Sequence, residues 1–545
     1  MLGMKTGMAY QAAKAPVLLH EIPARAAACW PEGAALTLSE QRLSYAALQT
    51  SIEHFASGLL GLGLARGERV AVYLEKRVET VVALFGVPAA ASVVVPVNPL
   101  LKPLQVAHIL QDCAVQVLVT SPARWAGLVA VLGHCPALCH VVLCESTDTA
   151  VPAAGVTLHT WNDWLAALPQ RAPLVPDNDV AAIFYTSGST GKPKGVVLSH
   201  RNLVAGAASV ASYLENTPDD CLLAALPLSF DAGFSQLTTG FLAGARVVLL
   251  NYLLPRDVLN TMAREAVTGL TAVPPLYMQL TSQDWPEGAS RHLRYWANTG
   301  GRLPRATLER LQAAAPQARP FLMYGLTEAF RSTFLPPDQV SLRPDSIGRA
   351  IPNAEILVLR EDGSACAVDE PGELVHRGPL VAQGYWNRPD ETAQRFRPLP
   401  AALRPAGVGA TLPELAVFSG DTVRRDADGF LYFVGRRDEM IKTSGYRVSP
   451  TEIEEALYAS GLVQEAVAYG VPHEVLGSAI QVRVFGSELA SGQADADTAQ
   501  LLRHCRETLP GYMVPSQVEW AQEPLPRNAN GKLDRQHGRA KHGPV

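Results

Sequence analysis

The chain has 545 residues, which is long enough to bury more than one hydrophobic core, so we expect more than one domain. Its composition is ordinary for a globular protein, with 48% hydrophobic and 18% charged residues. The net charge is −5 and no dense basic stripe occurs, which argues against a nucleic-acid-binding protein.

The first clear element is a helix over residues 45–60. Ser44 is a suitable N-cap, and apolar residues recur at helical spacing up to Leu60. Gly61, Gly63 and Gly67 then resemble a dinucleotide-binding fingerprint. Because they follow a helix rather than a strand, we interpret them as a helix C-cap and a turn.

The most apolar stretch, Val81–Leu101, contains three prolines and a β-branched run, Val93–Val95. This pattern favours a helix followed by a buried strand over an integral membrane segment. A short strand, Val70–Leu74, precedes it, and helices alternate with apolar strands up to about residue 360. We therefore predict an α/β protein with largely parallel sheets.

From about Ile356 the chain changes to short strands separated by turn signals, which predicts a β-rich subdomain. After Gly435 comes a stretch long enough for a small domain of its own. We expect it to be α+β, with a hairpin-like start, a helix near 450–459, strands near 465–469 and 481–485, and a final helix. The predicted domains are residues 1–435 and 436–545.

The eight cysteines are scattered, and Met1–Lys14 does not have the pattern of a secretory leader, so we expect reduced thiols in a cytoplasmic protein. Cys135, Cys139 and Cys144 lie close to two histidines. Their spacing matches no usual zinc pattern, and the apolar run after His140 is better interpreted as a strand with a buried cysteine.

Residues 183–200 carry the most specific signal. An apolar strand leads into a run of hydroxyl groups and glycines with two lysines, and a second strand follows. Glycines let backbone N–H groups approach phosphate oxygens, and Lys ammoniums add charge, which predicts a triphosphate or pyrophosphate cradle. Pro193 stands where a Walker A loop has Ser or Thr, and no kinase motifs follow.

The segment Thr186–Gly195 resembles the phosphate-loop signature of the superfamily of acyl-CoA synthetases, nonribosomal adenylation domains and luciferases. Further segments resemble the later signatures of that superfamily in the same order, over about residues 18 to 535. They are Tyr324–Glu328, Ser419–Asp421, Gly435–Asp438, Ser444–Arg447 with Glu452–Glu454, and Asn530–Lys532.

The resemblance implies an AMP-forming enzyme that uses ATP and Mg²⁺ to activate a small carboxylate as an acyl-AMP. It implies a large N-terminal domain that binds ATP and a small C-terminal domain on a hinge. Adenylation depends mainly on positioning and on charge neutralisation. The resemblance assigns the phosphates of ATP to Thr186, Ser187, Gly188, Ser189, Thr190, Gly191, Lys192 and Lys194.

The segment Tyr324–Glu328 would hold the rest of the nucleotide and the metal ion. Glu328 is the implied Mg²⁺ ligand, and the alternative is an ordinary charge at a helix N-terminus. Thr327 would bind the α-phosphate, and Tyr324 would stack on adenine, followed by Gly325. Gly300 and Gly301 would let backbone groups reach the adenine edge, or would form a plain turn.

The resemblance also assigns the ribose and the second half-reaction. Asp421 would accept hydrogen bonds from both ribose hydroxyls, with Arg436 nearby, and Lys532 would neutralise charge during adenylation. A rotation about the hinge at Asp438 would then remove Lys532 and bring up a second segment for thioester formation. That second segment comprises Lys442, Gly445, Tyr446 and Arg447.

The acid is not determined by these motifs. Phe230-Asp231 resembles amino-acid adenylation domains, in which the Asp pairs with the substrate ammonium. Alternatively, Asp231 pairs with a protein cation, for which Arg331 is the candidate. We expect Asp231, Met323 and Arg331 to face the acyl group.

Ser444–Glu454 resembles acyl-CoA synthetases, whereas Asn528–Arg535 resembles amino-acid adenylation domains. Pro227–Thr239, Met323–Thr333 and Phe433–Glu452 most resemble acyl-CoA ligases of bacterial exosortase A systems. We expect the thiol acceptor, CoA or the phosphopantetheine of an acyl carrier protein, to bind in trans. Three possibilities remain: acyl-thioester synthesis, amino-acid adenylation with carrier loading, and a non-catalytic adenylate-binding protein.

Overall fold

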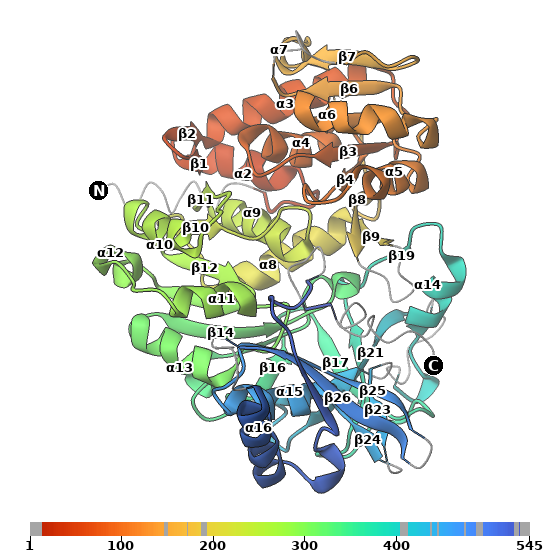
Figure 1. The fold of residues 1–545 in the computed structure, drawn as a ribbon. Coiled ribbons are helices and arrows are strands. Elements are labelled where there is room, and N and C mark those ends of the chain that lie inside the picture. The colour runs from red at the N-terminus through yellow and green to blue at the C-terminus, as the bar shows by residue number, and fades with distance from the viewer. Residues whose placement is uncertain are drawn as a thin grey trace.

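The computed structural model describes most of the chain and shows two large sheets with helices packed between and around them (Figure 1). The described residues are 14–145, 151–171, 173–186, 193–403, 413–436, 439–443, 446–473, 476–486, 494–527 and 533–534.

The first sheet lies at the top of Figure 1 and has eight strands. Its strands are parallel from β8 to β7, as the sequence predicts, whereas β9 and β19 add an antiparallel edge. In spatial order the strands are β19 (Gly384–Tyr385), β9 (Lys194–Ser199), β8 (Val180–Thr186), β4 (Val93–Pro96), β3 (Arg69–Tyr73), β5 (Val117–Thr120), β6 (His140–Leu143) and β7 (Thr157–Thr160).

The second sheet has fourteen strands and changes from parallel to antiparallel at β14. Its parallel half comprises β11 (Arg246–Leu249), β10 (Cys221–Ala224), β12 (Gly269–Ala272), β13 (Tyr295–Asn298) and β14 (Arg319–Tyr324), with β1 (Ala34–Leu38) and β2 (Gln41–Ser44) at the edge. Its antiparallel half comprises β15 (Thr333–Leu335), β16 (Ser346–Ala350), β22 (Leu431–Arg436), β21 (Leu415–Arg425), β18 (Gly372–Arg377) and β17 (Glu355–Leu359), with β20 (Phe396–Pro398) on β21. This half is the predicted β-rich subdomain.

Helices fill the space between the two sheets and cover the outer face of the second sheet. One continuous core joins the inner faces of both sheets through α3, α4, α8 and α9, and a second core lies under α10, α11 and α13. The helices of this part are α2 (Glu21–Cys29), α3 (Tyr45–Gly61), α4 (Val78–Ala89), α5 (Pro103–Asp112), α6 (Pro122–Leu128), α7 (Trp161–Leu165), α8 (His200–Leu214), α9 (Asp231–Ala243), α10 (Pro255–Arg264), α11 (Pro274–Thr281), α12 (Glu287–Arg291), α13 (Arg305–Ala314) and α14 (Pro389–Arg395).

The local predictions for the N-terminal part are confirmed. The Ser44 hydroxyl accepts a hydrogen bond from the Ala47 amide at 3.2 Å and caps α3, and the glycines after α3 lie in a turn in which Gly63 has a φ of +70°. The apolar stretch forms α4 and the buried strand β4. Across the described residues, no helix combines the length and the apolarity needed to span a membrane.

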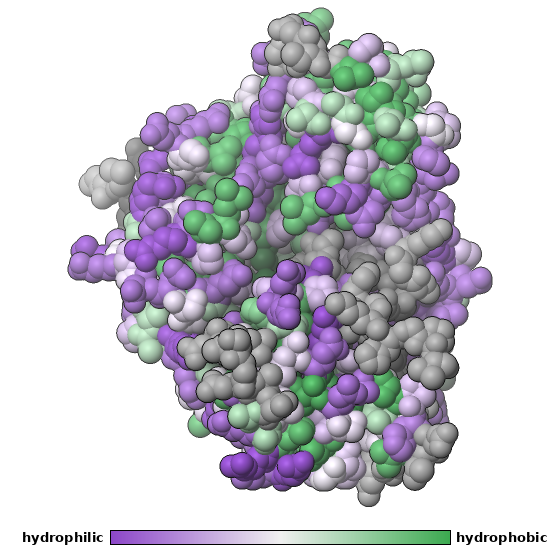
Figure 2. Space-filling model, viewed as in Figure 1, coloured by the Kyte–Doolittle hydropathy of each residue, from purple (hydrophilic) through white to green (hydrophobic). Residues whose placement is uncertain are grey.

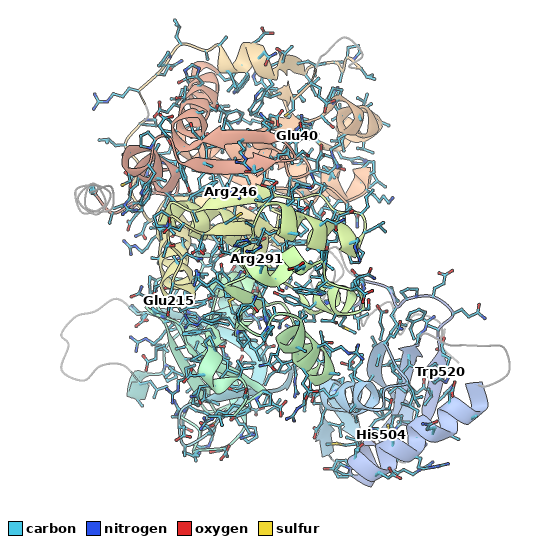
Figure 3. All side chains as sticks on the ribbon, turned by 90° about the vertical axis from the view of Figure 1, so that its left-hand side faces the viewer. Glu40, Glu215, Arg246, Arg291, His504 and Trp520 are labelled. Carbon is cyan, nitrogen blue, oxygen red and sulfur yellow. The ribbon has the colours of Figure 1, made fainter. Side chains whose placement is uncertain are left out.

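The C-terminal part forms a separate α+β unit with its own core (Figures 1 and 3). Its elements are the hairpin β23 (Ile441–Thr443) and β24 (Tyr446–Val448), α15 (Pro450–Ala459), β25 (Glu465–His473), β26 (Gly477–Phe485), α16 (Ala494–Thr508) and β27 (Gln517–Trp520). Contrary to expectation, α16 is not the last element: β27 follows it and pairs in parallel with β26, where Trp520 donates a hydrogen bond back to Thr498 of α16 at 2.8 Å.

One cation connects the C-terminal unit to the body of the protein. Arg302 contacts Asp345 of the body and Glu455 of α15 through its two terminal nitrogens. All three side chains are at least one-third exposed, so this bridge contributes little to stability by itself. Figure 2 shows hydrophilic and hydrophobic side chains interspersed over the face of the molecule seen in Figure 1.

Replacing Gly233, near the start of α9, by a residue with a side chain should lower the stability of the protein measurably. A Cβ at Gly233 would lie 1.9 Å from the carbonyl oxygen of Pro227, a backbone atom that cannot rotate away. We expect Gly233→Ala to cost about 2 kcal/mol or more and to lower the melting temperature by several degrees. Differential scanning fluorimetry measures this change.

The matched control is Gly127→Ala in α6, where a Cβ would meet no heavy atom within 4 Å. Because alanine favours a helix over glycine, this variant should match or slightly exceed the parent in melting temperature. Equal melting temperatures for both variants would contradict the steric argument.

Candidate functional site

The predicted phosphate loop connects two antiparallel strands, β8 and β9. Thr186 is the last residue of β8 and pairs in register with Lys194, the first residue of β9. The two ends of the loop are thus held side by side. The intervening predicted site residues, Ser187, Gly188, Ser189, Thr190, Gly191 and Lys192, lie outside the described residues.

Lys194 leads from the loop to an acidic centre. Its ammonium forms an ion pair with Glu391 of α14 and lies 5.1 Å from the centre of the Tyr385 ring. The Tyr385 hydroxyl donates a hydrogen bond to Glu328 Oε1 at 2.5 Å. Burial raises the pKa of Tyr385, and the Glu328 carboxylate adds to this shift, so the phenol stays protonated and donates.

Glu328 lies in a tight 3₁₀ turn, η2 (Thr327–Ala329), directly after β14. Its side chain is only 13% exposed, and Arg395 Nε lies 4.0 Å from Oε1. A carboxylate held in this way offers hard oxygen ligands of the kind that Mg²⁺ prefers. The prediction that Glu328 simply marks a helix N-terminus does not fit a single 3₁₀ turn.

The chain reverses direction after Glu328 at a residue with unusual backbone geometry. Phe330 has a φ of +56° and a ψ of −49°, which costs a non-glycine residue of order 1–3 kcal/mol. Its ring is buried against Gly206 of α8, where a Cβ would lie 2.5 Å from a ring carbon. The turn therefore directs Glu328 towards Tyr385 and Arg395, and Arg331 towards Asp231.

Asp421 forms the second acidic centre. Its Oδ2 accepts a hydrogen bond from the Tyr324 hydroxyl at 2.5 Å, and Arg436 Nε lies 3.3 Å from Oδ1. The side chain is 14% exposed, and Oδ1 accepts no hydrogen bond from the described residues. Burial raises the pKa of Asp421, and Arg436 and Tyr324 offset this only in part.

Arg395 connects the two acidic centres. Arg395 approaches Glu328 through Nε, and its Nη1 lies against Gly420, where a Cβ would be 2.7 Å away. The positive charge of Arg395 also lowers the pKa of Asp421. Gly420 has a φ of +68°, a conformation that glycine adopts without strain. The structure thus brings Lys194, Glu328, Tyr324, Asp421 and Arg436, all predicted from the sequence, into one region.

The two glycines after β13 form a turn. Gly300 has a φ of +78°, and Asn298 Nδ2 donates a hydrogen bond to the Gly301 carbonyl at 2.8 Å. The buried Asn298 holds this turn at the end of the sheet where β14 also ends. A role for Gly300 and Gly301 next to adenine, like stacking by Tyr324, phosphate binding by Thr327 and a role for Gly325, stays a prediction.

Asp231 and Arg331 pair with each other. Arg331 Nη1 lies 3.0 Å from Asp231 Oδ2 and also donates to its neighbour's carbonyl, that of Phe330, at 2.7 Å. This is the alternative in which a protein cation, rather than a substrate ammonium, neutralises Asp231. Met323 lies close by and accepts a hydrogen bond on its sulfur from the Tyr213 hydroxyl at 2.9 Å.

A small cavity of about 20 Å³ adjoins this ion pair between α8, α9 and the second sheet. Both Met323 and Arg331 line it, as predicted, whereas Asp231 reaches it only through Arg331 and Ala232. The lining residues are Val210, Leu214, Leu222, Ala232, Ser235, Gln236, Thr239, Gly269, Thr271, Tyr295, Met323 and Arg331.

Several predicted functional residues of the C-terminal part lie outside the described part of the structure. These are Asp438, Gly445, Lys532 and the side chains of Lys442, Tyr446 and Arg447. The backbone of the hairpin is described: Lys442 pairs with Arg447 and Thr443 with Tyr446. The hairpin therefore exists, and the roles of its side chains stay predictions.

Sequence reasoning missed three residues of the site. Tyr385, Glu391 and Arg395 come from β19 and α14, far along the chain from the phosphate loop. They reach the site because β19 pairs with β9. Nothing local distinguishes them in the sequence except their position between two recognised motifs.

An α/β body with a separate C-terminal unit, and with the buried carboxylates Glu328 and Asp421 close to one edge of the large sheet, is typical of nucleotide-binding enzymes. Residues 23–386 match the family described as AMP-binding enzyme, and residues 452–532 match the AMP-binding enzyme C-terminal domain. The chain belongs to the family of AMP-binding enzymes.

Several curated relatives are each 30% identical to the chain. Linear gramicidin synthase of Brevibacillus parabrevis matches over 95% of the chain, which spans only 9% of that protein. L-proline–[L-prolyl-carrier protein] ligase of Pseudomonas fluorescens matches over 95% of the chain and 98% of its own length. Long-chain-fatty-acid–CoA ligase of Yersinia pestis matches over 87% of the chain and 85% of its own length.

Solved structures share the whole fold. An anthranilate CoA ligase in complex with anthranoyl-AMP has a TM-score of 0.84 at 24% identity and covers 97% of this chain and 98% of its own, which shows the fold alone. o-Succinylbenzoate coenzyme A synthetase of Bacillus subtilis, in complex with ATP and magnesium ion, has a TM-score of 0.78 at 25% identity and covers 94% and 98%.

Replacing the buried Asp421 by Asn should raise the stability of the protein and weaken its binding of nucleotide. Because burial raises its folded-state pKa, its contribution to stability is present below the unfolded pKa and is lost as pH rises through the folded pKa. Asp421→Asn removes the buried charge, so the ligand-free protein should melt at a higher temperature at pH 7.5. The KM for ATP should rise roughly 10–100-fold through loss of a charged acceptor.

The matched control is Asp426→Asn, just after β21. Burial opposes ionisation there, but hydrogen bonds from the Phe430 amide and the Tyr432 hydroxyl lower the pKa of Asp426. The contribution of Asp426 to stability is present above its unfolded-state pKa and is lost as pH falls through its folded-state pKa. The Asp426→Asn variant should therefore have a lower melting temperature and an unchanged KM for ATP. A lower melting temperature for Asp421→Asn would refute the argument.

Proposed function

We propose that this protein is an acid–thiol ligase that converts a carboxylic acid and ATP to acyl-AMP and pyrophosphate, then transfers the acyl group to a thiol. The observation that carries the proposal is the series of interactions that runs from Lys194 through Tyr385 and Glu328 to Arg395, whose charge in turn acts on the pKa of Asp421. It connects the ends of a phosphate loop to a buried carboxylate with one oxygen that accepts no hydrogen bond from the described residues. Family membership and the AMP-forming relatives support it.

Asp421 suits the ribose of ATP. Its Oδ1 is buried and accepts no hydrogen bond from the described residues, and its pKa is raised by that burial. Two ribose hydroxyls would supply the donors that the carboxylate needs to stay ionised in this place. Tyr324 already holds the other oxygen and orients the carboxylate.

Glu328 suits Mg²⁺. Its carboxylate is mostly buried and oriented by the Tyr385 hydroxyl. Mg²⁺ commonly takes one or two protein carboxylates together with phosphate oxygens, and it would neutralise phosphate charge there. Arg395 limits the net negative charge around Glu328 in the absence of the metal ion.

The adenylation step is an in-line displacement in which the protein mainly holds groups in place. A carboxylate oxygen of the acid forms a bond to the α-phosphorus, and the bond from that phosphorus to the pyrophosphate oxygen breaks. Lys194 is placed at the loop to hold phosphate charge once it exchanges Glu391 for phosphate oxygens. Lys532 would neutralise charge between the carboxylate and the α-phosphate.

The second step forms the thioester. The thiol sulfur bonds to the acyl carbon, the bond to the phosphate oxygen of AMP breaks, and the thiol proton is released. We propose that the hairpin around Gly445–Arg447 approaches the site at this stage, after rotation about Asp438. The relatives support either CoA or a phosphopantetheinyl carrier as acceptor, because one is a CoA ligase and another is a carrier-protein ligase.

Amino-acid adenylation is the second candidate function, and the ion pair of Asp231 argues against it. An ammonium would have to displace Arg331, which is buried and lies 3.0 Å from the carboxylate. A non-catalytic adenylate-binding protein, the third possibility, would not need Glu328 and Lys532 in addition to Asp421.

The cellular setting is part of the proposal. All eight cysteines are free, which suits a reducing compartment such as the bacterial cytoplasm, where ATP and CoA are at hand. The resemblance of three segments to exosortase A-associated ligases suggests a substrate that serves envelope polysaccharide or protein sorting.

Lys532 separates the two half-reactions. We expect Lys532→Ala to lower carboxylate-dependent ATP–pyrophosphate exchange by about 10²–10³-fold, because a charge that stabilises the transition state is lost. Thioester formation from supplied acyl-AMP should stay close to the parent rate. Both are measured with radiolabelled pyrophosphate and by thiol-ester chromatography.

The control variant is Lys541→Ala, nine positions further along the chain, which should leave both rates unchanged. Unchanged exchange in Lys532→Ala would remove Lys532 from adenylation. Absence of exchange in the parent protein with fatty, aryl, hydroxy and amino acids alike would instead refute the proposed function.

A further inference from the structure

Two residues that line the cavity beside the Asp231–Arg331 ion pair each carry a buried polar atom without a hydrogen-bond partner among the described residues. These atoms are Gln236 Oε1, an acceptor, and Arg331 Nε, a donor. Gln236 is 6% exposed and Arg331 is 2% exposed, so bulk water does not satisfy either of them. Because buried polar groups in native proteins are almost always paired, these two atoms favour a ligand that offers them hydrogen-bond partners.

The orientation of the Gln236 amide follows from its neighbours. Its Nε2 donates to the carbonyl oxygens of Leu223 at 2.8 Å and Thr271 at 3.3 Å. Both partners are acceptors only, so the nitrogen must face them and the oxygen must be the unpaired group. Gln236 therefore requires a hydrogen-bond donor from whatever binds next to it.

The charge of the cavity is balanced. Asp231 neutralises Arg331 through Nη1, while Nε has no partner among the described residues. Because this ion pair is neutral overall, it offers an unpaired counter-charge neither to a second carboxylate on the acid nor to an ammonium. Either ion would be buried without a free counter-charge, which is unfavourable.

The walls of the cavity favour a short acyl group. Its volume of about 20 Å³ is little more than the 10–15 Å³ that one water molecule needs. Met323, which lines it, is held by the Tyr213 hydroxyl, and the Tyr213 ring stacks on Phe334 at 4.2 Å. Tyr295 closes another side and accepts a hydrogen bond from Asn216 at 3.1 Å.

We infer that the acid is a short hydroxy acid, uncharged apart from its reacting carboxylate, whose hydroxyl group is recognised by Gln236 Oε1 and the Arg331 guanidinium. A hydroxyl group both donates and accepts, so it supplies what each of the two unpaired groups requires. Gln236 and Arg331 are then specificity-determining residues. This inference rests on the proposed function, because it names the acid that the enzyme adenylates.

The test is ATP–pyrophosphate exchange of the full chain with matched acids. The panel contains 2-, 3- and 4-hydroxybutyrate, butyrate, 2-aminobutyrate, succinate and palmitate. We expect kcat/KM for one hydroxybutyrate to exceed that for each of the other acids by about tenfold or more, since an unpaired buried polar group penalises the analogue without the hydroxyl. Butyrate, 2-aminobutyrate, succinate or palmitate as the best acid would overturn the inference while leaving adenylation intact.

Two substitutions test the charge balance in opposite directions. Asp231→Asn leaves Arg331 without its counter-charge, so the ratio of succinate to hydroxybutyrate activity should rise about tenfold or more. Arg331→Gln leaves the Asp231 carboxylate without its counter-charge, so the ratio of 2-aminobutyrate to hydroxybutyrate activity should rise instead. Asp219→Asn, at an exposed position next to the buried Asp220, is the control and should leave all ratios unchanged.

Gln236→Leu tests the acceptor. It should abolish the preference for hydroxybutyrate over butyrate while the activity with butyrate persists. A preserved preference in this variant would remove Gln236 from recognition. Because Gln236 also holds two backbone carbonyls, the melting temperature of the Gln236→Leu variant is compared with that of Asp219→Asn. The acid panel on the parent protein decides the inference even if the Gln236→Leu variant does not fold.

Discussion

The backbone reversal after β14 is the constraint on which both halves of the site depend. Phe330 adopts a positive φ that is unfavourable for its residue type, and the missing side chain of Gly206 lets its ring pack into the core. Burial of that ring offsets the strain. The reversal places Glu328 next to Tyr385 and Arg395, and three residues later it places Arg331 next to Asp231. One short turn therefore separates the region proposed to bind the nucleotide from the region proposed to bind the acyl group.

The nucleotide region shows the conflict between stability and function that ligand sites often have. Asp421 is buried, its pKa is raised, and one oxygen accepts no hydrogen bond from the described residues. A core built for stability alone would avoid such a carboxylate. Tyr324, Arg436 and Arg395 offset the cost only in part, and the remainder indicates what a nucleotide would contribute on binding.

The acyl region follows a different principle. Its ion pair cancels its own charge. In the proposed enzyme this neutrality would lower the affinity for acids that carry a second ion and leave hydrogen bonding and size to select the substrate. Gln236 acts in the same way as Asn298 in the turn after β13: a buried amide fixes backbone carbonyls with one end. Gln236 also lines the cavity, and its side-chain oxygen accepts no hydrogen bond from the described residues.

The sequence by itself determined the α/β fold, the helix at Ser44, the β-rich subdomain, the C-terminal unit and five residues that the structure brings together in one region, because these depend on local periodicity, capping and short motifs with fixed spacing. It did not predict β27, since a short strand paired in parallel has no local signal. Only the tertiary structure decided that Tyr385, Glu391 and Arg395 join the site, because pairing of β19 with β9 brings them there across nearly two hundred residues. It also decided the partner of Asp231, since a carboxylate chooses its cation by proximity in the folded chain, and that pairing argues against the amino-acid substrate that the sequence left open.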